Sequence, residues 1–202
     1  MIAIVDYGVG NLFSLKSSLD MIGANSIITS DKKTILDSDR IILPGVGAFR
    51  DAINKLTELG LDRIIKEKAA KNKPILGICL GMQLLFDVSY EFGEFKGLSL
   101  IKGEIKSIED ETDNLKIPHM GWNKLIFNKP SPLFKYIKNG DYVYFVHSYY
   151  ACTNNEYVSS YTEYGKLLTA SCEYKNVYGC QFHPEKSGEV GLNILKAFCE
   201  LE

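Results

Sequence analysis

One cysteine between two glycines has the clearest chemical potential in this chain. Cys79 follows the apolar run 75–78, which is typical of a buried strand, and precedes residues 80–86, whose pattern predicts a helix that begins at once. The thiol would then lie on a sharp turn, where Gly77 and Gly81 remove the Cβ atoms that would crowd it. The positive end of the helix dipole favours the reactive thiolate. This pattern predicts a nucleophile elbow that carries sulfur, and the alternative is a buried cysteine that only packs.

A histidine and a carboxylate near the end of the chain supply the other groups of a nucleophilic triad. Pro184 favours an extended conformation for His183, and residues two apart in extended chain point to the same side. Glu185 can therefore orient the imidazole, which can take the thiol proton of Cys79. The order Cys…His…Glu differs from that of chymotrypsin-like and subtilisin-like enzymes, and the papain-type signature is absent. We predict a catalytic triad of these three residues.

The composition is that of an ordinary soluble protein and excludes several functional classes. The 202 residues suit one domain, 1–202, which can bury roughly 70% of its unfolded surface. A net charge of -2 gives no sign of nucleic-acid binding, and the chain lacks both an apolar membrane span and a signal peptide. The five scattered cysteines and three histidines show no disulfide or ligand spacing. We therefore expect a cytoplasmic protein without a metal site.

Strand and helix patterns alternate in the first part of the chain. This alternation predicts a parallel sheet with helices on both faces. Because the sites of such sheets lie beyond the carboxyl ends of the strands, Cys79 and the loop 44–47 are expected at the same edge. The expected strands are 1–5, 26–29, 40–43 and 75–78, and the expected helices begin near residues 12 and 48, with a break near Gly60 and a short polar helix between the second and third strands.

The second half of the chain is rich in strand patterns. Alternating polar and apolar residues predict antiparallel and mixed pairing, and residues 187–201 close the chain as an amphipathic helix. A Gly-x-Gly at residues 8–10 suggests a dinucleotide loop, but the third glycine position of that fingerprint is Phe13, so the pattern fails. The expected strands are 103–108, 121–127, 142–146, 158–162, 167–173 and 177–182.

Several segments resemble, in order along nearly the whole chain, those of a known enzyme class. Residues 77–83 (Gly-Ile-Cys-Leu-Gly-Met-Gln) and 181–185 (Gln-Phe-His-Pro-Glu) resemble the triad motifs of the class I glutamine amidotransferases. Residues 44–47 (Pro-Gly-Val-Gly) and 118–123 (Pro-His-Met-Gly-Trp-Asn) narrow the resemblance to the HisH family, the glutaminase subunits of imidazole glycerol phosphate synthase. The resemblance implies a three-layer α/β fold, with a central, mostly parallel sheet flanked by helices and an additional antiparallel β portion in the second half.

The resemblance also implies roles for individual residues. Cys79 would attack the side-chain amide of L-glutamine, with His183 as acid and base and Glu185 orienting it. The backbone N–H groups of Val46 and Leu80 would form the oxyanion hole. The positions that match the glutamine pocket of the family are Gly47, Gln83, Ser148 and Tyr149. Alternatively, Gln83 is an ordinary polar residue on a helix, and Ser148 and Tyr149 only end a strand.

A chain filled by a glutaminase leaves no room for an acceptor domain, which implies a separate partner for the ammonia. The resemblance implies a (β/α)8 barrel cyclase subunit in a heterodimer, which makes imidazole glycerol phosphate and AICAR in histidine biosynthesis. It implies no cofactor, no nucleic acid and no membrane. The residues expected at the contact with the barrel are Asn11, His119, Trp122 and Lys186.

Three other functions remain open at this point. A paralogous glutaminase subunit can supply ammonia for the amidation of surface sugars. An acyl hydrolase or peptidase can use the same elbow. A binding protein can retain the scaffold of an enzyme without its activity, although the complete set of Cys79, His183 and Glu185 argues against that reading.

Overall fold

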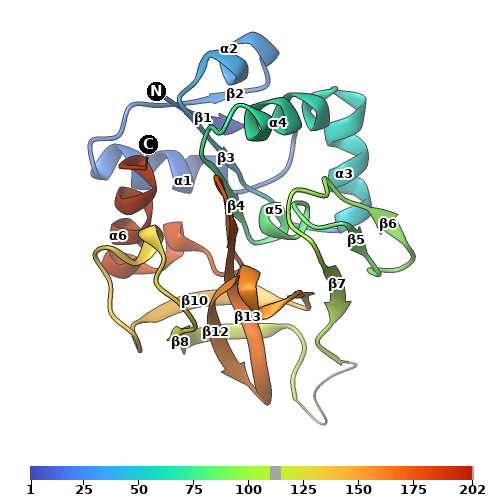
Figure 1. The fold of residues 1–202 in the computed structure, drawn as a ribbon, viewed down its shortest axis with the longest axis vertical. Helices are drawn as coiled ribbons and strands as arrows, with labels where there is room; N and C mark the ends of the chain where they lie inside the picture. The colour runs from blue at the N-terminus through green and yellow to red at the C-terminus, as the bar shows by residue number, and fades with distance from the viewer. Residues whose placement is uncertain (110–114, 202) are drawn as a thin grey trace.

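An eight-stranded sheet is the central layer of the computed structural model, which describes residues 1–109 and 115–201 (Figure 1). The first five strands of the sheet are parallel to their neighbours, and the last three pair antiparallel. The expectation of a mostly parallel sheet is thus confirmed. In spatial order the strands are β2 (Ser26–Thr29), β1 (Ile2–Val5), β3 (Arg40–Leu43), β4 (Ile75–Ile78), β14 (Val177–Cys180), β13 (Lys166–Tyr174), β12 (Val158–Tyr164) and β9 (Ile126–Phe127).

Helices cover both faces of the parallel strands, because successive side chains of a strand point to opposite sides. Ile2 and Ile4 of β1 belong to one buried cluster, which includes residues of α1 and α6. Ala3 and Val5 belong to the other, which includes residues of α2, α3, α4 and α5. β1 and β4 are therefore apolar and buried at every position, as expected of strands covered on two sides. The helices are α1 (Leu12–Met21), α2 (Lys32–Asp37), α3 (Phe49–Glu58), α4 (Leu61–Ala70), α5 (Leu80–Gln83) and α6 (Gly188–Cys199).

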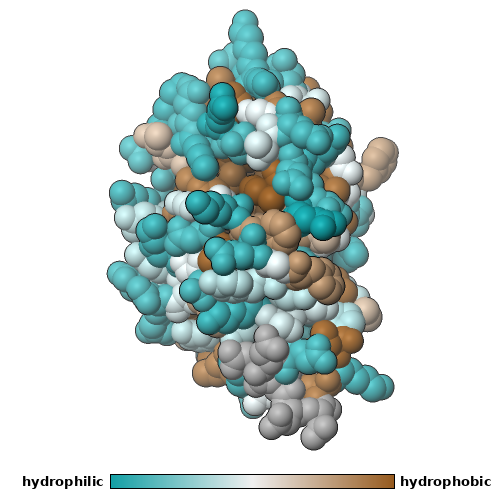
Figure 2. Space-filling view, turned by 90° about the vertical axis from the view of Figure 1, so that its right-hand side faces the viewer, coloured by the Kyte–Doolittle hydropathy of each residue, from teal (hydrophilic) through white to brown (hydrophobic). Residues whose placement is uncertain are grey.

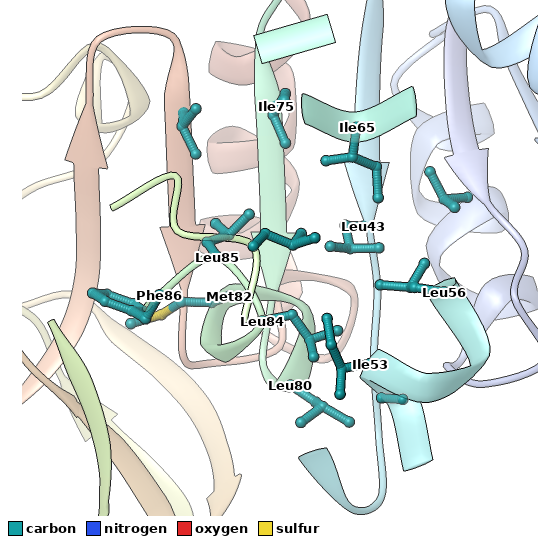
Figure 3. Close-up of a cluster of buried hydrophobic side chains, with 14 of the residues drawn as sticks. Leu43, Ile53, Leu56, Ile65, Ile75, Leu80, Met82, Leu84, Leu85 and Phe86 are labelled. Atoms are coloured by element: carbon teal, nitrogen blue, oxygen red, sulfur yellow. The ribbon is translucent and has the colours of Figure 1, made fainter. Parts of the chain in front are cut away.

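Helix α5 is shorter than the sequence predicts. It ends at Gln83, whereas the apolar pattern predicted a helix over residues 80–86. Leu84, Leu85 and Phe86 still pack into the core, as Figure 3 shows. Their carbonyl groups accept hydrogen bonds from the segment 98–101, with N···O distances of 2.8 to 3.1 Å. These bonds replace the helical ones, so the buried apolar run continues as turns rather than as helix.

Two smaller sheets carry the antiparallel β portion of the second half. The strand expected over 121–127 is in fact two strands in different sheets, because pairing changes from one partner strand to another on either side of the buried Leu125. The two-stranded sheet pairs β8 (His119–Lys124) with β10 (Tyr142–His147). The other sheet contains, in order, β11 (Tyr149–Cys152), β7 (Glu104–Ser107), β5 (Val88–Ser89) and β6 (Phe95–Lys96). Short 3-10 turns lie at η2 (Pro132–Phe134), η3 (Asn155–Tyr157) and η4 (Pro184–Lys186).

The cysteines are unpaired and the face of the surface in Figure 2 is largely hydrophilic, as the composition predicted. All five cysteines are free, as their scattered positions predicted. Figure 2 shows a largely hydrophilic face, on which hydrophobic side chains emerge mainly near the middle. Within residues 1–109 and 115–201, no helix has both the length and the apolar character that crossing a membrane requires.

Candidate active site

Cys79 lies on a strained turn between β4 and α5. Its φ of 54° and ψ of -113° lie in a region that residues with side chains rarely adopt, at a cost of about 1–3 kcal/mol. The turn is held from both sides: the Cys79 N–H donates to the Cys180 carbonyl at 2.7 Å, and the Cys79 carbonyl accepts from the Gln83 N–H at 3.2 Å. The predicted elbow is present, and the thiol is 7% exposed at the floor of a cavity.

The glycines on either side of the cysteine are required by close backbone contacts. A Cβ atom on Gly77 would lie 2.6 Å from the carbonyl oxygen of Gly81. A Cβ atom on Gly81 would lie only 1.8 Å from the carbonyl oxygen of Leu43, in the neighbouring strand β3. The first turn of α5 can therefore start directly against the end of the sheet, which holds Cys79 and Leu80 at its edge.

The triad residues converge because β4 and β14 are parallel neighbours. Cys79 follows β4, and His183 follows β14 at the same edge of the sheet. The Nδ1 atom of His183 lies 2.8 Å from Oε1 of Glu185, and both side chains are almost fully buried. His183 is extended as predicted, but Glu185 lies in the 3-10 turn η4 rather than in extended chain. This turn brings its carboxylate to Nδ1 of the imidazole.

The electrostatics of His183 suit an acid–base residue. Burial alone would lower the pKa of its imidazole, but Cys79 and Glu185 outweigh the burial and raise that pKa from the ordinary 6.5 to about 9. Within the described residues, its Nε2 atom is buried and has no hydrogen-bond partner. Nε2 is thus available to a reacting group, while Nδ1 is held by the carboxylate. At neutral pH the raised pKa favours the imidazolium form of His183.

A cavity of about 530 Å3 opens above the cysteine. Eight of the nine residues predicted for catalysis and substrate binding line it. The ninth, Glu185, does not line it but is hydrogen-bonded to His183, which does. Because residues from seven separate segments meet here, the cavity can hold a small polar molecule against the thiol. The lining consists of Val46, Gly47, Cys79, Leu80, Gln83, Glu91, Phe92, Ser107, Glu109, Ile117, Pro118, Val146, His147, Ser148, Tyr149 and His183.

The residues predicted to supply the oxyanion donors, Val46 and Leu80, both line this cavity. Leu80 is the first residue of α5, so its N–H has no acceptor within the helix. Val46 is 42% exposed on the loop after β3, which the Tyr7 hydroxyl holds by donating to the Pro44 carbonyl at 2.7 Å. Gly47 follows with a φ of 92°. Two backbone segments can therefore present N–H groups to an oxygen bound near the sulfur.

The predicted interface residues divide into two groups. Trp122 is 53% exposed and contacts Tyr144, whose ring centroid also lies 6.0 Å from Nζ of the exposed Lys186. Asn11, at the start of α1, borders a small hollow that His183 and Glu185 also border. His119 differs, because its ring is fully buried and lies 4.1 Å from the ring of Tyr164. Its side chain supports β8 from within and presents no surface to a partner.

Several polar residues of the site were not predicted, among them Glu91, His147 and Gln181. Glu91 is half-buried in the cavity wall, and the Phe49 N–H donates to its carboxylate at 2.5 Å. His147 is fully paired, with Nδ1 at 2.8 Å from the Tyr149 carbonyl, and burial lowers its pKa to about 3. Gln181, fully buried, lies against the thiol. Gln181 is the first residue of the Gln-Phe-His-Pro-Glu motif, whereas no local pattern marks Glu91.

Comparison with known proteins identifies the class of enzyme. Residues 3–200 match the sequence model of one protein family, described as glutamine amidotransferase class-I. The chain belongs to the class I glutamine amidotransferases. It is therefore an enzyme of this class, and the predicted family is confirmed.

Relatives of this amidotransferase narrow the assignment further. It is 52% identical over 202 residues to the imidazole glycerol phosphate synthase subunit HisH of Caldanaerobacter subterraneus subsp. tengcongensis, covering 100% of this chain and 98% of the relative. It is 51% identical to the subunit of that name from Carboxydothermus hydrogenoformans, with both chains covered completely. At this identity over the full length, the chain is a member of the HisH family.

Solved structures show the same fold at low sequence identity. PurLQS from Thermotoga maritima matches with a TM-score of 0.72 at 21% identity, over 98% of this chain and 96% of that one. A structure described as a glutamine amidotransferase matches with a TM-score of 0.76 at 15% identity, over 98% and 99% of the two chains. The class I amidotransferase fold predicted from the sequence is confirmed.

Proposed function

We propose that this amidotransferase hydrolyses L-glutamine at Cys79 and supplies the ammonia to a (β/α)8 barrel cyclase, as the glutaminase subunit of imidazole glycerol phosphate synthase. The observation that carries the proposal is the joint position of Cys79, His183 and Glu185 at one sheet edge, under a cavity of suitable size. The barrel would use the ammonia to make imidazole glycerol phosphate and AICAR in histidine biosynthesis, in the cytoplasm.

The acylation step uses the thiolate and the imidazolium as a pair. Sγ of Cys79 attacks the side-chain amide carbon of glutamine, and the carbonyl oxygen becomes an oxyanion held by the N–H groups of Leu80 and Val46. His183 gives the proton on Nε2 to the amide nitrogen, the C–N bond breaks, and ammonia leaves a glutamyl thioester. Glu185 holds Nδ1 throughout and stabilises the cationic ring.

The second step returns the enzyme to its starting state. His183, now neutral, takes a proton from a water molecule, and the resulting hydroxide attacks the thioester carbon. The C–S bond of the tetrahedral intermediate breaks, which releases glutamate and the Cys79 thiolate. The same oxyanion donors serve both steps, because both intermediates place negative charge on the same oxygen.

Polar groups in the cavity wall can hold the amino-acid end of glutamine. We assign the α-ammonium group to the Glu91 carboxylate, since this is a half-buried acid facing the cavity. Both hydrogens of the Gln83 side-chain amide already go to protein acceptors, so Gln83 can offer the substrate only its oxygen. Gly47, Ser148 and Tyr149 complete the proposed pocket and lie within reach of the α-carboxylate.

The partner would cover the surface made by Asn11, Trp122 and Lys186. Asn11 borders the hollow next to His183 and Glu185, so a protein bound there would lie beside the catalytic residues. Trp122 and Lys186 meet at Tyr144 and offer an aromatic and a cationic group. Such groups are enriched where protein interfaces carry most of their binding energy.

The test is glutamine hydrolysis by the full chain, alone and with each purified barrel cyclase of the same organism. We expect the histidine-pathway barrel to form a 1:1 complex and to increase hydrolysis, and Cys79→Ala to abolish it. Activation only by a barrel of a surface-sugar pathway would overturn the histidine assignment. Turnover of peptides or esters in place of glutamine would overturn the glutaminase assignment.

A further inference from the structure

A line of three buried polar groups connects the backbone of β11 to the catalytic sulfur. Nε2 of Gln83 donates to the Tyr149 carbonyl at 3.0 Å and to Oε1 of Gln181 at 3.1 Å. Nε2 of Gln181 donates in turn to Sγ of Cys79, at 3.8 Å. Gln181 is fully buried, and Gln83 is only 5% exposed. Gln181, in the middle of the line, is therefore shielded from water, whereas Gln83 and Cys79 border the cavity.

The chemistry of the Tyr149 carbonyl fixes the direction of every bond in this line. A carbonyl oxygen only accepts, so the Gln83 amide must turn its NH2 group toward it. The second hydrogen of that NH2 group then faces Gln181 and requires an acceptor there, which is Oε1. Gln181 is left with its own NH2 group on the side of the sulfur. The alternative orientation would bring two NH2 groups together and leave a buried donor unpaired.

Besides His183 and Gln181, the sulfur has a further near neighbour, and this one is an acceptor. The Val146 carbonyl oxygen lies 3.8 Å from Sγ and can accept the hydrogen of a neutral thiol. Once the proton has left, that carbonyl faces a negative charge, and an N–H group is required to offset it. The buried amide of Gln181 is such a group, and its backbone is anchored by an N–H bond to the Ala170 carbonyl at 2.8 Å.

We infer that Gln181 is a positioning residue that stabilises the Cys79 thiolate, and that Gln83 acts through it by holding its amide in the donating orientation. The inference rests on the proposed function, in which that thiolate is the nucleophile. It gives Gln83 a second role that does not depend on bound glutamine. It also explains why a fully buried polar side chain occupies the position two residues before His183.

The test measures alkylation of Cys79 by iodoacetamide across a range of pH in the full chain, with the labelled peptide quantified by mass spectrometry. In Gln181→Met, a side chain of similar length without a donor, we expect the pH of half-maximal rate to rise by about half to one pH unit. Glutamine hydrolysis in the barrel complex should lose roughly tenfold in kcat with KM within about twofold. Gln83→Met should shift the alkylation profile in the same direction by less, because the Gln181 amide becomes free to turn.

Thr162→Val is the matched control. Thr162 is also fully buried in the sheet and makes one hydrogen bond, to the Lys124 carbonyl at 3.1 Å, far from the sulfur. It should leave the alkylation profile unchanged. A folded Gln181→Met whose profile superimposes on that of the unsubstituted chain overturns the inference, and an unshifted Gln83→Met overturns the role of Gln83. Alkylation requires no glutamine, so these results are separate from a failure of glutaminase activity itself.

Discussion

Replacing Gly81 by alanine should break the contact on which the nucleophile elbow depends. The added Cβ would lie 1.8 Å from the Leu43 carbonyl oxygen, about 1.2 Å short of the 3.0 Å below which such contacts essentially never occur. Both partners are backbone, so no flexible side chain can move aside. Since Gly81 has an ordinary φ, the whole penalty is steric. We expect a loss of about 3 kcal/mol in the free energy of unfolding, the upper end of the range for overpacking.

The assay compares thermal unfolding with glutamine hydrolysis in the barrel complex. A loss of this size should lower Tm by roughly 6–12 °C in a chain of this length. Displacing Cys79 and Leu80 by about 1 Å should lower kcat on the order of a hundredfold. Gly140→Ala is the control. Gly140, unlike Gly81, has a positive φ, but nothing lies within 4 Å of its Cβ position, so the change should cost only about 1 kcal/mol of backbone strain and leave kcat unchanged. If Gly81→Ala has the same Tm as Gly140→Ala, or keeps full activity, the reasoning is wrong.

Three further predictions concern the charged groups of the site. Glu185→Gln should bring the pKa of His183 down from about 9 and lower kcat on the order of a thousandfold, read from the pH–rate profile. The pKa of His183 is higher in the folded chain than its ordinary 6.5, so protonation of this residue should contribute about 3 kcal/mol to the free energy of unfolding. That contribution should be complete below pH 6.5 and lost as pH rises through about 9. Urea unfolding of the chain and of His183→Asn at each pH can measure it. Glu91→Gln should raise KM for glutamine roughly thirtyfold and leave kcat within about twofold, and an unchanged KM would remove Glu91 from the binding site.

The parts of the site that the sequence predicted are those that local chemistry determines. Gly77 and Gly81 mark a turn that few other residues can make, and the structure shows backbone atoms in the space that their side chains would fill. The alternation of strands and helices predicted that Cys79 and the loop 44–47 share one edge, whereas the parallel pairing of β14 with β4, which brings His183 to that edge, was not predicted. The triad was proposed from the chemistry of two segments about a hundred residues apart in the chain. The family resemblance added the loop 44–47 and the pocket residues, which share no local pattern.

What the sequence could not predict depends on contacts between distant segments. The length of α5 is set by hydrogen bonds from residues 98–101, which compete with the helix for the carbonyls of residues 84–86. Glu91 reaches the cavity only because its carboxylate accepts the Phe49 N–H, across 42 positions of sequence. His119 alternates with exposed neighbours along β8, and only the pairing of that strand with β10 shows that it faces inward.

The strained turn at Cys79 follows from the architecture of the sheet around it. A thiol at the end of a straight β4 would point to the same face as Ile75, among buried side chains that include Leu43 and Ile65. The positive φ at Cys79 instead lifts the sulfur to the sheet edge, where Val146, Gln181 and His183 surround it. That conformation costs about 1–3 kcal/mol, which one residue cannot recover by itself. The neighbouring backbone recovers it, through the 2.7 Å bond to Cys180 and the close approach of α5 to β3 that the glycines permit. Reactivity and fold stability therefore depend on the same contacts, so substitutions that loosen this turn should lower Tm and kcat together.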